Sequence, residues 1–140
     1  IESSSLQGVQ IAGDMVPRLI DEIPVIAVLG ACAAGITEIR DAQELKVKES
    51  NRLSAIAGEL SKMGVPIEEL PDGLRIYGGK KLKGAVCESH HDHRIAMALA
   101  VAGLVAQGTT VIKNAEVINI SFPGFANTLR DIGVELEEGL

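Results

Sequence analysis

The sequence predicts an α/β protein in which helices are buried and sheets lie on the outside. Two segments, IPVIAVLGACAAG (23–35) and IAMALAVAGLVA (95–106), are apolar on almost every side. Helices of this kind are buried in a core, whereas doubly wound folds expose one face of each helix. Hydrophobic residues make up 46% of the 140-residue chain and aromatic residues only 2%. The core is therefore expected to consist of Ile, Val, Leu and Ala in one globular domain.

Glycines and prolines divide the first half of the chain into alternating strands and helices. Leu53, Ile56 and Leu60 recur at helical spacing, and Gly64 follows them as an expected left-handed helix cap. The stretch PDG (71–73) predicts a hairpin. The expected elements are strands at about 9–11, 37–40, 66–69 and 74–77, and helices at about 19–34 and 50–63.

The chain contains an internal repeat of roughly 70 residues. GITEIRDA (35–42) matches GTTVIKNA (108–115), and ELSKMGVPIEE (59–69) matches TLRDIGVELEE (128–138) in the same order. Each unit is expected to contain strand, helix, strand, helix and strand, with a further strand closing the first unit. No linker-like stretch separates the two units, so we interpret them as parts of one domain.

Composition excludes several classes of partner. The net charge of −6 disfavours non-specific binding to nucleic acid or anionic membranes, and few aromatic rings are present to stack on bases. The apolar runs are too short to span a bilayer. Cys32 and Cys87 lie in apolar stretches without metal-ligand spacing. We expect them to be buried free thiols of a cytoplasmic protein.

The repeat places Asp21 opposite Arg94, each at the start of an apolar helix. An arginine at a helix N-terminus opposes the helix dipole. The arrangement is explained if an anion binds there to the guanidinium and to free backbone N–H groups. Alternatively, Arg94 pairs with Asp92 or Glu88 and only closes the helix, which the residue types by themselves favour.

The run of His90, His91, Asp92 and His93 suggests a metal site at first sight. Metal ligands must converge on one point, whereas consecutive residues in a strand or turn diverge. No matching carboxylate–histidine pair stands out elsewhere in the sequence. We therefore expect no metal.

The stretch LKVKESNRL (45–53) joins a strand pattern to a helix pattern. Apolar residues and lysines alternate at its start, which predicts a strand with Lys46 and Lys48 on one face. Ser50 is the expected N-cap of the following helix. The stretch thus concentrates positive charge in an acidic protein.

Glu49 and Arg52 are three residues apart, close enough to pair or to face the same ligand. A carboxylate among three cations is either a salt-bridged corner or a general acid among phosphate-binding groups. Asp21 is either a helix N-terminal carboxylate or a general base at a pocket mouth. The residues alone leave the first question open, and they favour the helix N-terminal role for Asp21.

Four motifs, in order, give the chain a family resemblance: LIDEIPVIAV, ELKVKESNRL, HDHRIAMA and SFPGF. Together they resemble the C-terminal part of the EPSP synthase family. The resemblance implies the enolpyruvyl transferase fold, an inside-out α/β barrel with two domains of three βαβαββ units each. It implies that this chain is a partial domain of two units, about 1–80 and 81–140. The N-terminal domain of the same enzyme would then be its missing partner.

The resemblance also implies a reaction. This family transfers the enolpyruvyl group of phosphoenolpyruvate to the 5-hydroxyl of shikimate 3-phosphate and releases phosphate, without a metal or organic cofactor. By resemblance, Asp21 is the base near the attacked hydroxyl and, with Lys48, a ligand of shikimate 3-phosphate. Glu49 is the implied proton donor to the methylene carbon of phosphoenolpyruvate.

The same resemblance implies that Arg52 and Arg94 hold the carboxylate and phosphate of phosphoenolpyruvate, with His93 beside them. The chain departs from the family pattern in places. It has SNR where SDR is more usual, HHDHR where Gly often precedes DHR, and Ile120 where some members have Lys. A phosphoenolpyruvate contact at Ile120 is therefore missing or comes from elsewhere.

Two other functions compete with this one. The sister enzyme that transfers enolpyruvyl to UDP-N-acetylglucosamine shares the fold, although the VKES and DHR motifs favour the shikimate enzyme. A non-catalytic anion-binding module is the alternative of another class. Since the family's other domain supplies further ligands, we expect this chain alone to fold but not to turn over.

Overall fold

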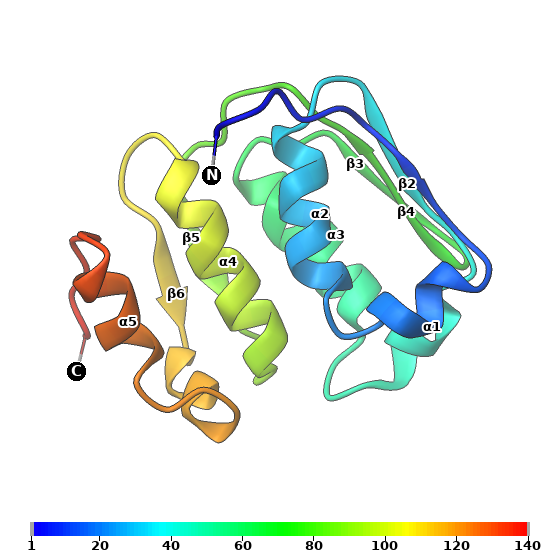
Figure 1. Cartoon of the computed structure of the whole chain (residues 1–140). Coiled ribbons are helices and arrows are strands. Elements are labelled where there is room, and N and C mark those ends of the chain that lie inside the picture. Colours follow the sequence, from blue (N-terminus) through cyan, green and yellow to red (C-terminus); the bar gives the residue numbers. More distant parts are fainter. Residues whose placement is uncertain (1, 140) are drawn as a thin grey trace.

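A computed structural model of the protein describes residues 2–139 and places the longer helices between two sheets (Figure 1). The strands are β1 Gln10–Ile11, β2 Ile36–Ile39, β3 Ile67–Leu70, β4 Gly73–Tyr77, β5 Val86–Glu88 and β6 Val111–Lys113. The α-helices are α1 Met15–Leu19, α2 Ile23–Cys32, α3 Arg52–Lys62, α4 His93–Val105 and α5 Phe125–Asp131. Two 3-10 helices, η1 Gln43–Val47 and η2 Ala115–Ile120, complete the elements of this region.

The larger sheet has the strand order β1-β2-β4-β3. β1 runs parallel to β2, and β4 is antiparallel to both of its neighbours. Leu70 pairs with Gly73, so Pro71 and Asp72 form a two-residue turn and the predicted hairpin is confirmed. The smaller sheet is the parallel pair β5 and β6.

Helices α2, α3 and α4 run in the same direction, with their first residues at the lower end of Figure 1. They pack through a core without aromatic side chains, and each buried Leu or Ile contributes roughly 1.5–3 kcal/mol. The largest fully buried apolar side chains on these helices are Ile23, Leu53, Ile56, Leu60, Ile95 and Leu99. The prediction of internal helices and external sheets is confirmed.

A pair of glycines shows why two helices approach the segments that follow them so closely. Gly30 of α2 and Gly103 of α4 occupy matching positions of the repeat. A Cβ added at Gly30 would lie 3.0 Å from the Cβ of Thr37, and one at Gly103 would lie 3.3 Å from the Cβ of Thr110. Each threonine thus packs against bare helix backbone, which a larger residue would push away.

The helix predicted over 19–34 is α2, which begins later than expected, at Ile23, because Leu19 belongs to a separate short helix, α1. A turn separates the two helices. Pro24 lies in the first turn of α2, where backbone N–H groups have no partner within the helix, so its missing N–H costs no hydrogen bond. The same residue prevents α1 and α2 from forming one continuous helix.

Cys32, predicted to be buried, is exposed at the end of α2, whereas Cys87 is buried. Both are free thiols.

The predicted strand with Lys46 and Lys48 on one face is wrong, since this segment forms η1 and its C-cap. Asp41 has a φ of 57°, and its N–H donates to Asp72, so the chain turns away from the sheet. Only Leu45 is buried, while Val47 is 80% exposed. One apolar anchor suits a short turn of helix better than a strand without a partner.

The strand expected at the end of the second unit also differs from the structure, because residues 134–139 form none. The matching strand of the first unit, β3, is paired along its length with β4. Within the described residues, no strand runs beside 134–139 to pair with it.

Across residues 2–139, no helix has the length and apolar character needed to cross a membrane.

Candidate functional site

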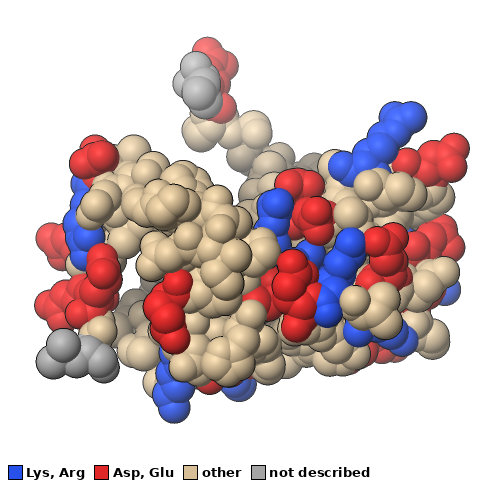
Figure 2. Space-filling view, turned by 90° about the horizontal axis from the view of Figure 1, so that it is seen from below, with Lys and Arg blue, Asp and Glu red and all other residues tan. Residues whose placement is uncertain are grey.

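The predicted site residues gather where the N-termini of three helices meet. Asp21 precedes α2, Arg52 begins α3, and Arg94 is the second residue of α4. Figure 2 views this end of the molecule, over which basic and acidic side chains interleave. Parallel helices with adjacent N-termini give such a surface an affinity for anions.

The centre of the site is the side chain of Arg52, which is only 2% exposed. Its Nη1 lies 2.9 Å from Oδ1 of Asp21, and its Nη2 lies 2.6 Å from Oε2 of Glu49. Its Nε donates to Oδ2 of Asp92 at 2.8 Å. One guanidinium therefore joins the two carboxylates that the sequence suggested as base and acid.

Asp92 is a residue whose importance sequence reasoning missed. It is fully buried, and besides Arg52 it accepts hydrogen bonds from Ser50 Oγ and from the backbone N–H of Arg94, both at 2.9 Å. Burial raises the pKa of its carboxyl, but the bonds from Arg52 and Ser50 outweigh that effect and hold the pKa below its usual range. Its place directly before an apolar helix is the N-cap signal that could have singled it out.

The start of α3 differs from the prediction. Ser50 is not the N-cap, because its hydroxyl donates to Asp92. Asn51 has that role, and its side-chain oxygen accepts from the backbone N–H of Ser54 at 3.2 Å. The departure from the more usual SDR pattern thus keeps a residue type that is favoured at helix N-caps.

Arg94 has a more open environment than Arg52. Its side chain is 34% exposed, and Nη1 lies 3.1 Å from Oε1 of Glu22. The predicted alternative, a side-chain pair with Asp92 or Glu88, is wrong, since only the backbone N–H of Arg94 contacts Asp92. His93 is half-buried beside it as the first residue of α4.

Lys48 lies at the edge of the same surface. Its Nζ is 2.8 Å from Oε1 of Glu44, one turn earlier. The hydrogen bond to Glu44 raises the pKa of Lys48 from its ordinary value. Lys48 is therefore a fixed positive charge next to the Arg52 cluster.

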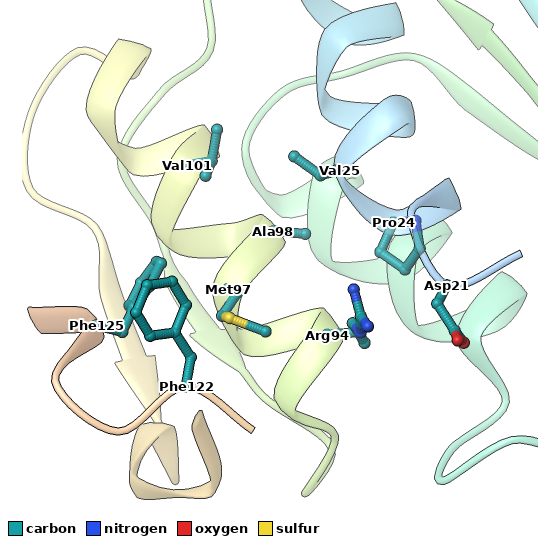
Figure 3. A pocket seen from close by; sticks show the side chains of 9 residues that line it. All are labelled: Asp21, Pro24, Val25, Arg94, Met97, Ala98, Val101, Phe122 and Phe125. Carbon is teal, nitrogen blue, oxygen red and sulfur yellow. The ribbon is translucent and has the colours of Figure 1, made fainter. Parts of the chain in front are cut away.

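A shallow groove runs from the site between α2 and α4 (Figure 3). Asp21 and Arg94 lie at one end, and the rest of its lining is apolar. The apolar lining consists of Pro24, Val25, Met97, Ala98, Val101, Phe122 and Phe125. Ile120 is 76% exposed and does not line the groove. The carboxylates of Asp21 and Glu49 are about half-exposed, whereas Arg52 and Asp92 beneath them are buried.

The histidines of the HHDH stretch do not converge. His90 points to α3, where its Nε2 lies 2.8 Å from Oε1 of Glu59. Within residues 2–139, no group of three or more His, Cys, Asp or Glu side chains is placed to hold a metal ion.

Comparison with known proteins identifies the family. The model of the EPSP synthase (3-phosphoshikimate 1-carboxyvinyltransferase) family matches residues 2–129. The chain belongs to the EPSP synthase family. The 3-phosphoshikimate 1-carboxyvinyltransferase of Desulforamulus reducens is 58% identical over 135 residues, and that of Bacillus thuringiensis strain Al Hakam is 52% identical over 132. These matches cover 96% and 94% of this chain.

A solved structure agrees with the fold. EPSP synthase from Acinetobacter baumannii superposes with a TM-score of 0.91 at 38% identity, over 95% of this chain. The matched region is 32% of that structure and 32% and 31% of the two relatives. The chain thus spans about a third of the length of the EPSP synthases it matches.

Proposed function

We propose that this chain is part of an enzyme that transfers the enolpyruvyl group of phosphoenolpyruvate to the 5-hydroxyl of shikimate 3-phosphate. The observation that carries the proposal is the joining of Asp21 and Glu49 by the buried guanidinium of Arg52. Addition and elimination at an enol ether require a base at the attacking hydroxyl and an acid at the methylene carbon. Both carboxylates are half-exposed, so a bound substrate can reach them.

In this proposal Asp21 takes the proton of the attacking hydroxyl, and Lys48 contacts the rest of shikimate 3-phosphate. Glu49 delivers a proton to the methylene carbon, which gives a tetrahedral intermediate. As phosphate leaves this intermediate, the new methyl group returns a proton to Glu49, and the carbon–carbon double bond is restored. Lys48 and Glu49 are adjacent, and Asp21 and Glu49 each lie on one nitrogen of the same guanidinium. This arrangement supports placing the reacting atoms of both substrates beside the guanidinium of Arg52.

Phosphoenolpyruvate is proposed to bind between Arg52 and Arg94, with His93 beside it. Planar guanidinium groups bind carboxylate and phosphate in bidentate fashion. Within residues 2–139, the side chain of Arg94 pairs only with the exposed carboxylate of Glu22, and such pairs contribute about 0–1 kcal/mol. When a substrate anion replaces Glu22 as the partner of Arg94, the lost ion pair therefore costs little free energy.

The half-exposed carboxylates of the site support a role for further parts of the enzyme. We propose that the chain supplies two of the three βαβαββ units of one domain, and that a second domain covers the site and excludes water. The free thiols Cys32 and Cys87 support placing the enzyme in the cytoplasm.

The proposal is tested by Glu49→Gln in an enzyme of full family length that carries this chain. Phosphate release with both substrates is expected to fall by roughly 100-fold or more in kcat, because the proton donor is lost. Glu68→Gln is the matched control, since Glu68 is exposed on β3 and pairs with Arg75 on the neighbouring strand. Unchanged kcat in Glu49→Gln would favour a non-catalytic anion-binding module. UDP-N-acetylglucosamine as the acceptor tests the sister activity.

The 140-residue chain alone is expected to bind anions without catalysing the reaction. It holds only part of the charges that two anionic substrates require, and its site is open to water. A steady-state assay of phosphate release by the isolated chain checks this, and clear turnover would contradict the proposed need for a second domain.

A further inference from the structure

Glu59 is a buried acid outside the proposed catalytic cluster, and it lies two helical turns after Arg52 on α3. Its Oε2 accepts the backbone N–H of Glu88 at 3.0 Å, and its Oε1 lies 2.8 Å from Nε2 of His90. Lys62 Nζ lies within 2.9 Å of both oxygens. The carboxylate therefore contacts the segment between β5 and α4 at two residues, Glu88 and His90.

That loop has an unfavourable backbone conformation. His90 and His91 have φ values of 53° and 54°, in the left-handed region that residues with a Cβ rarely adopt. The loop is closed on itself by Ser89, whose Oγ accepts from the N–H of His91 and whose carbonyl accepts from the N–H of Asp92. Such a conformation persists only where surrounding contacts enforce it.

The end of the loop is the part that reaches the proposed site. Asp92 closes the loop, holds Arg52 and caps α4, whose first two residues are His93 and Arg94. Helix α3 thus holds the loop at both ends. Glu59 bonds to the start of the loop at Glu88, and Arg52 bonds to its end at Asp92. A shift of the loop would move both arginines of the proposed phosphoenolpyruvate site.

We propose that Glu59 is a positioning residue that orients the phosphoenolpyruvate site by fixing the loop from Glu88 to Asp92. This inference rests on the proposed function for its substrate. It also predicts a separation between substrates, because Lys48 and Asp21, the proposed ligands of shikimate 3-phosphate, lie outside this loop.

The kinetic test uses Glu59→Gln in an enzyme of full family length, with Glu68→Gln as the control on the sheet. Gln keeps the size of the side chain but cannot accept all the hydrogen bonds that Glu59 accepts. The KM for phosphoenolpyruvate is expected to rise about tenfold or more, while the KM for shikimate 3-phosphate changes less than about twofold. Equal changes in both KM values, or no change in either, would overturn the proposal.

Amide hydrogen exchange provides a readout that does not depend on activity. In Glu59→Gln, exchange at His91, Asp92 and Arg94 is expected to be about tenfold faster or more, while β4 amides keep their wild-type rates. If Glu59→Gln speeds exchange in this loop but the wild-type enzyme does not transfer enolpyruvyl, the positioning role is supported and the proposed function is refuted. Unchanged loop exchange would overturn the positioning role itself.

A second pair of variants covers the case in which Glu59→Gln does not fold. His90→Asn tolerates the left-handed backbone but is too short to reach Glu59, whereas His90→Gln can still donate to it. His90→Asn is expected to raise the KM for phosphoenolpyruvate, and His90→Gln to restore most of the loss. Equal behaviour of the two variants would contradict a role for the His90–Glu59 contact.

Discussion

Arg52 and Arg94 are both arginines at the N-termini of parallel helices, yet their surroundings differ. Arg52 is 2% exposed and contacts three carboxylates, one of them fully buried. Arg94 is 34% exposed and meets the exposed carboxylate of Glu22. Both are in positions where the helix dipole disfavours a cation.

The difference in burial determines how much free energy it costs to remove the partner of each arginine. A buried ion pair is costly to break from either side, because the remaining charge cannot return to water. An exposed pair contributes little and exchanges partners easily. Arg52 is therefore part of the fold, whereas Arg94 is the more accessible of the two arginines and is proposed to bind an anion.

The largest expected effect is that of Asp92→Asn on stability. It leaves the buried side of Arg52 without its charge partner, so the free energy of unfolding is expected to fall by about 3–5 kcal/mol. Urea unfolding of the 140-residue chain measures this. Asp131→Asn, at the exposed end of α5, is the control with the same change in net charge. Similar small losses in both would remove the distinction between the two arginines.

Arg94→Met is expected to impair binding but not folding. The loss of charge-assisted hydrogen bonds to a substrate anion costs about 1.5–3 kcal/mol, which raises the KM for phosphoenolpyruvate roughly 10- to 150-fold. Steady-state kinetics of the full-length enzyme measure it. Arg130→Met, of similar exposure on α5, should leave KM unchanged. A large loss of stability in Arg94→Met would contradict the proposal that Arg94 serves binding and not folding.

A smaller effect is expected from acid. The pKa of Asp92 is below its usual range in the folded protein, so its contribution to stability is present above the unfolded value of about 3.9. That contribution is lost as pH falls through the lower, folded pKa. The difference in stability between wild type and Asp92→Asn should therefore shrink in acid, as pH-dependent urea unfolding can show. A difference that grows as pH falls would contradict this sign.

Glu22→Gln is expected to have the smallest effect. It removes the exposed partner of Arg94, so the free energy of unfolding should change by less than about 1 kcal/mol. The KM for phosphoenolpyruvate should stay equal or fall slightly, because the anion no longer competes with Glu22. A clear rise in this KM would indicate that Glu22 orients Arg94.

Much of the fold was predictable from local patterns. The apolar helices, the hairpin around PDG and the cap at Gly64, with its φ of 83°, all depend on short-range sequence. The segments that were mispredicted depend on partners. Lys46 and Lys48 alternate with apolar residues, but their segment forms η1 instead of a strand. In the part of the chain that the structure describes, no strand lies beside 134–139 to pair with it.

The site was predicted as a set of residues but not as a geometry. The sequence motifs singled out Asp21, Glu49 and Arg52 as site residues. The roles of these residues in the reaction remain predictions. The buried Asp92 was considered only as a possible partner of Arg94 or a metal ligand. Its contact with Arg52 joins residues 40 apart in the chain, a separation that neither periodicity nor local spacing reveals.

The sequence by itself determined that helices lie inside an aliphatic core and that the chain has an EPSP synthase pattern. These properties follow from periodicity and motif order, which are local. Only the tertiary structure decided which cation is buried and which is available. Burial and pairing depend on how α2, α3 and α4 bring their N-termini together, so two arginines of the same kind acquire different energetics.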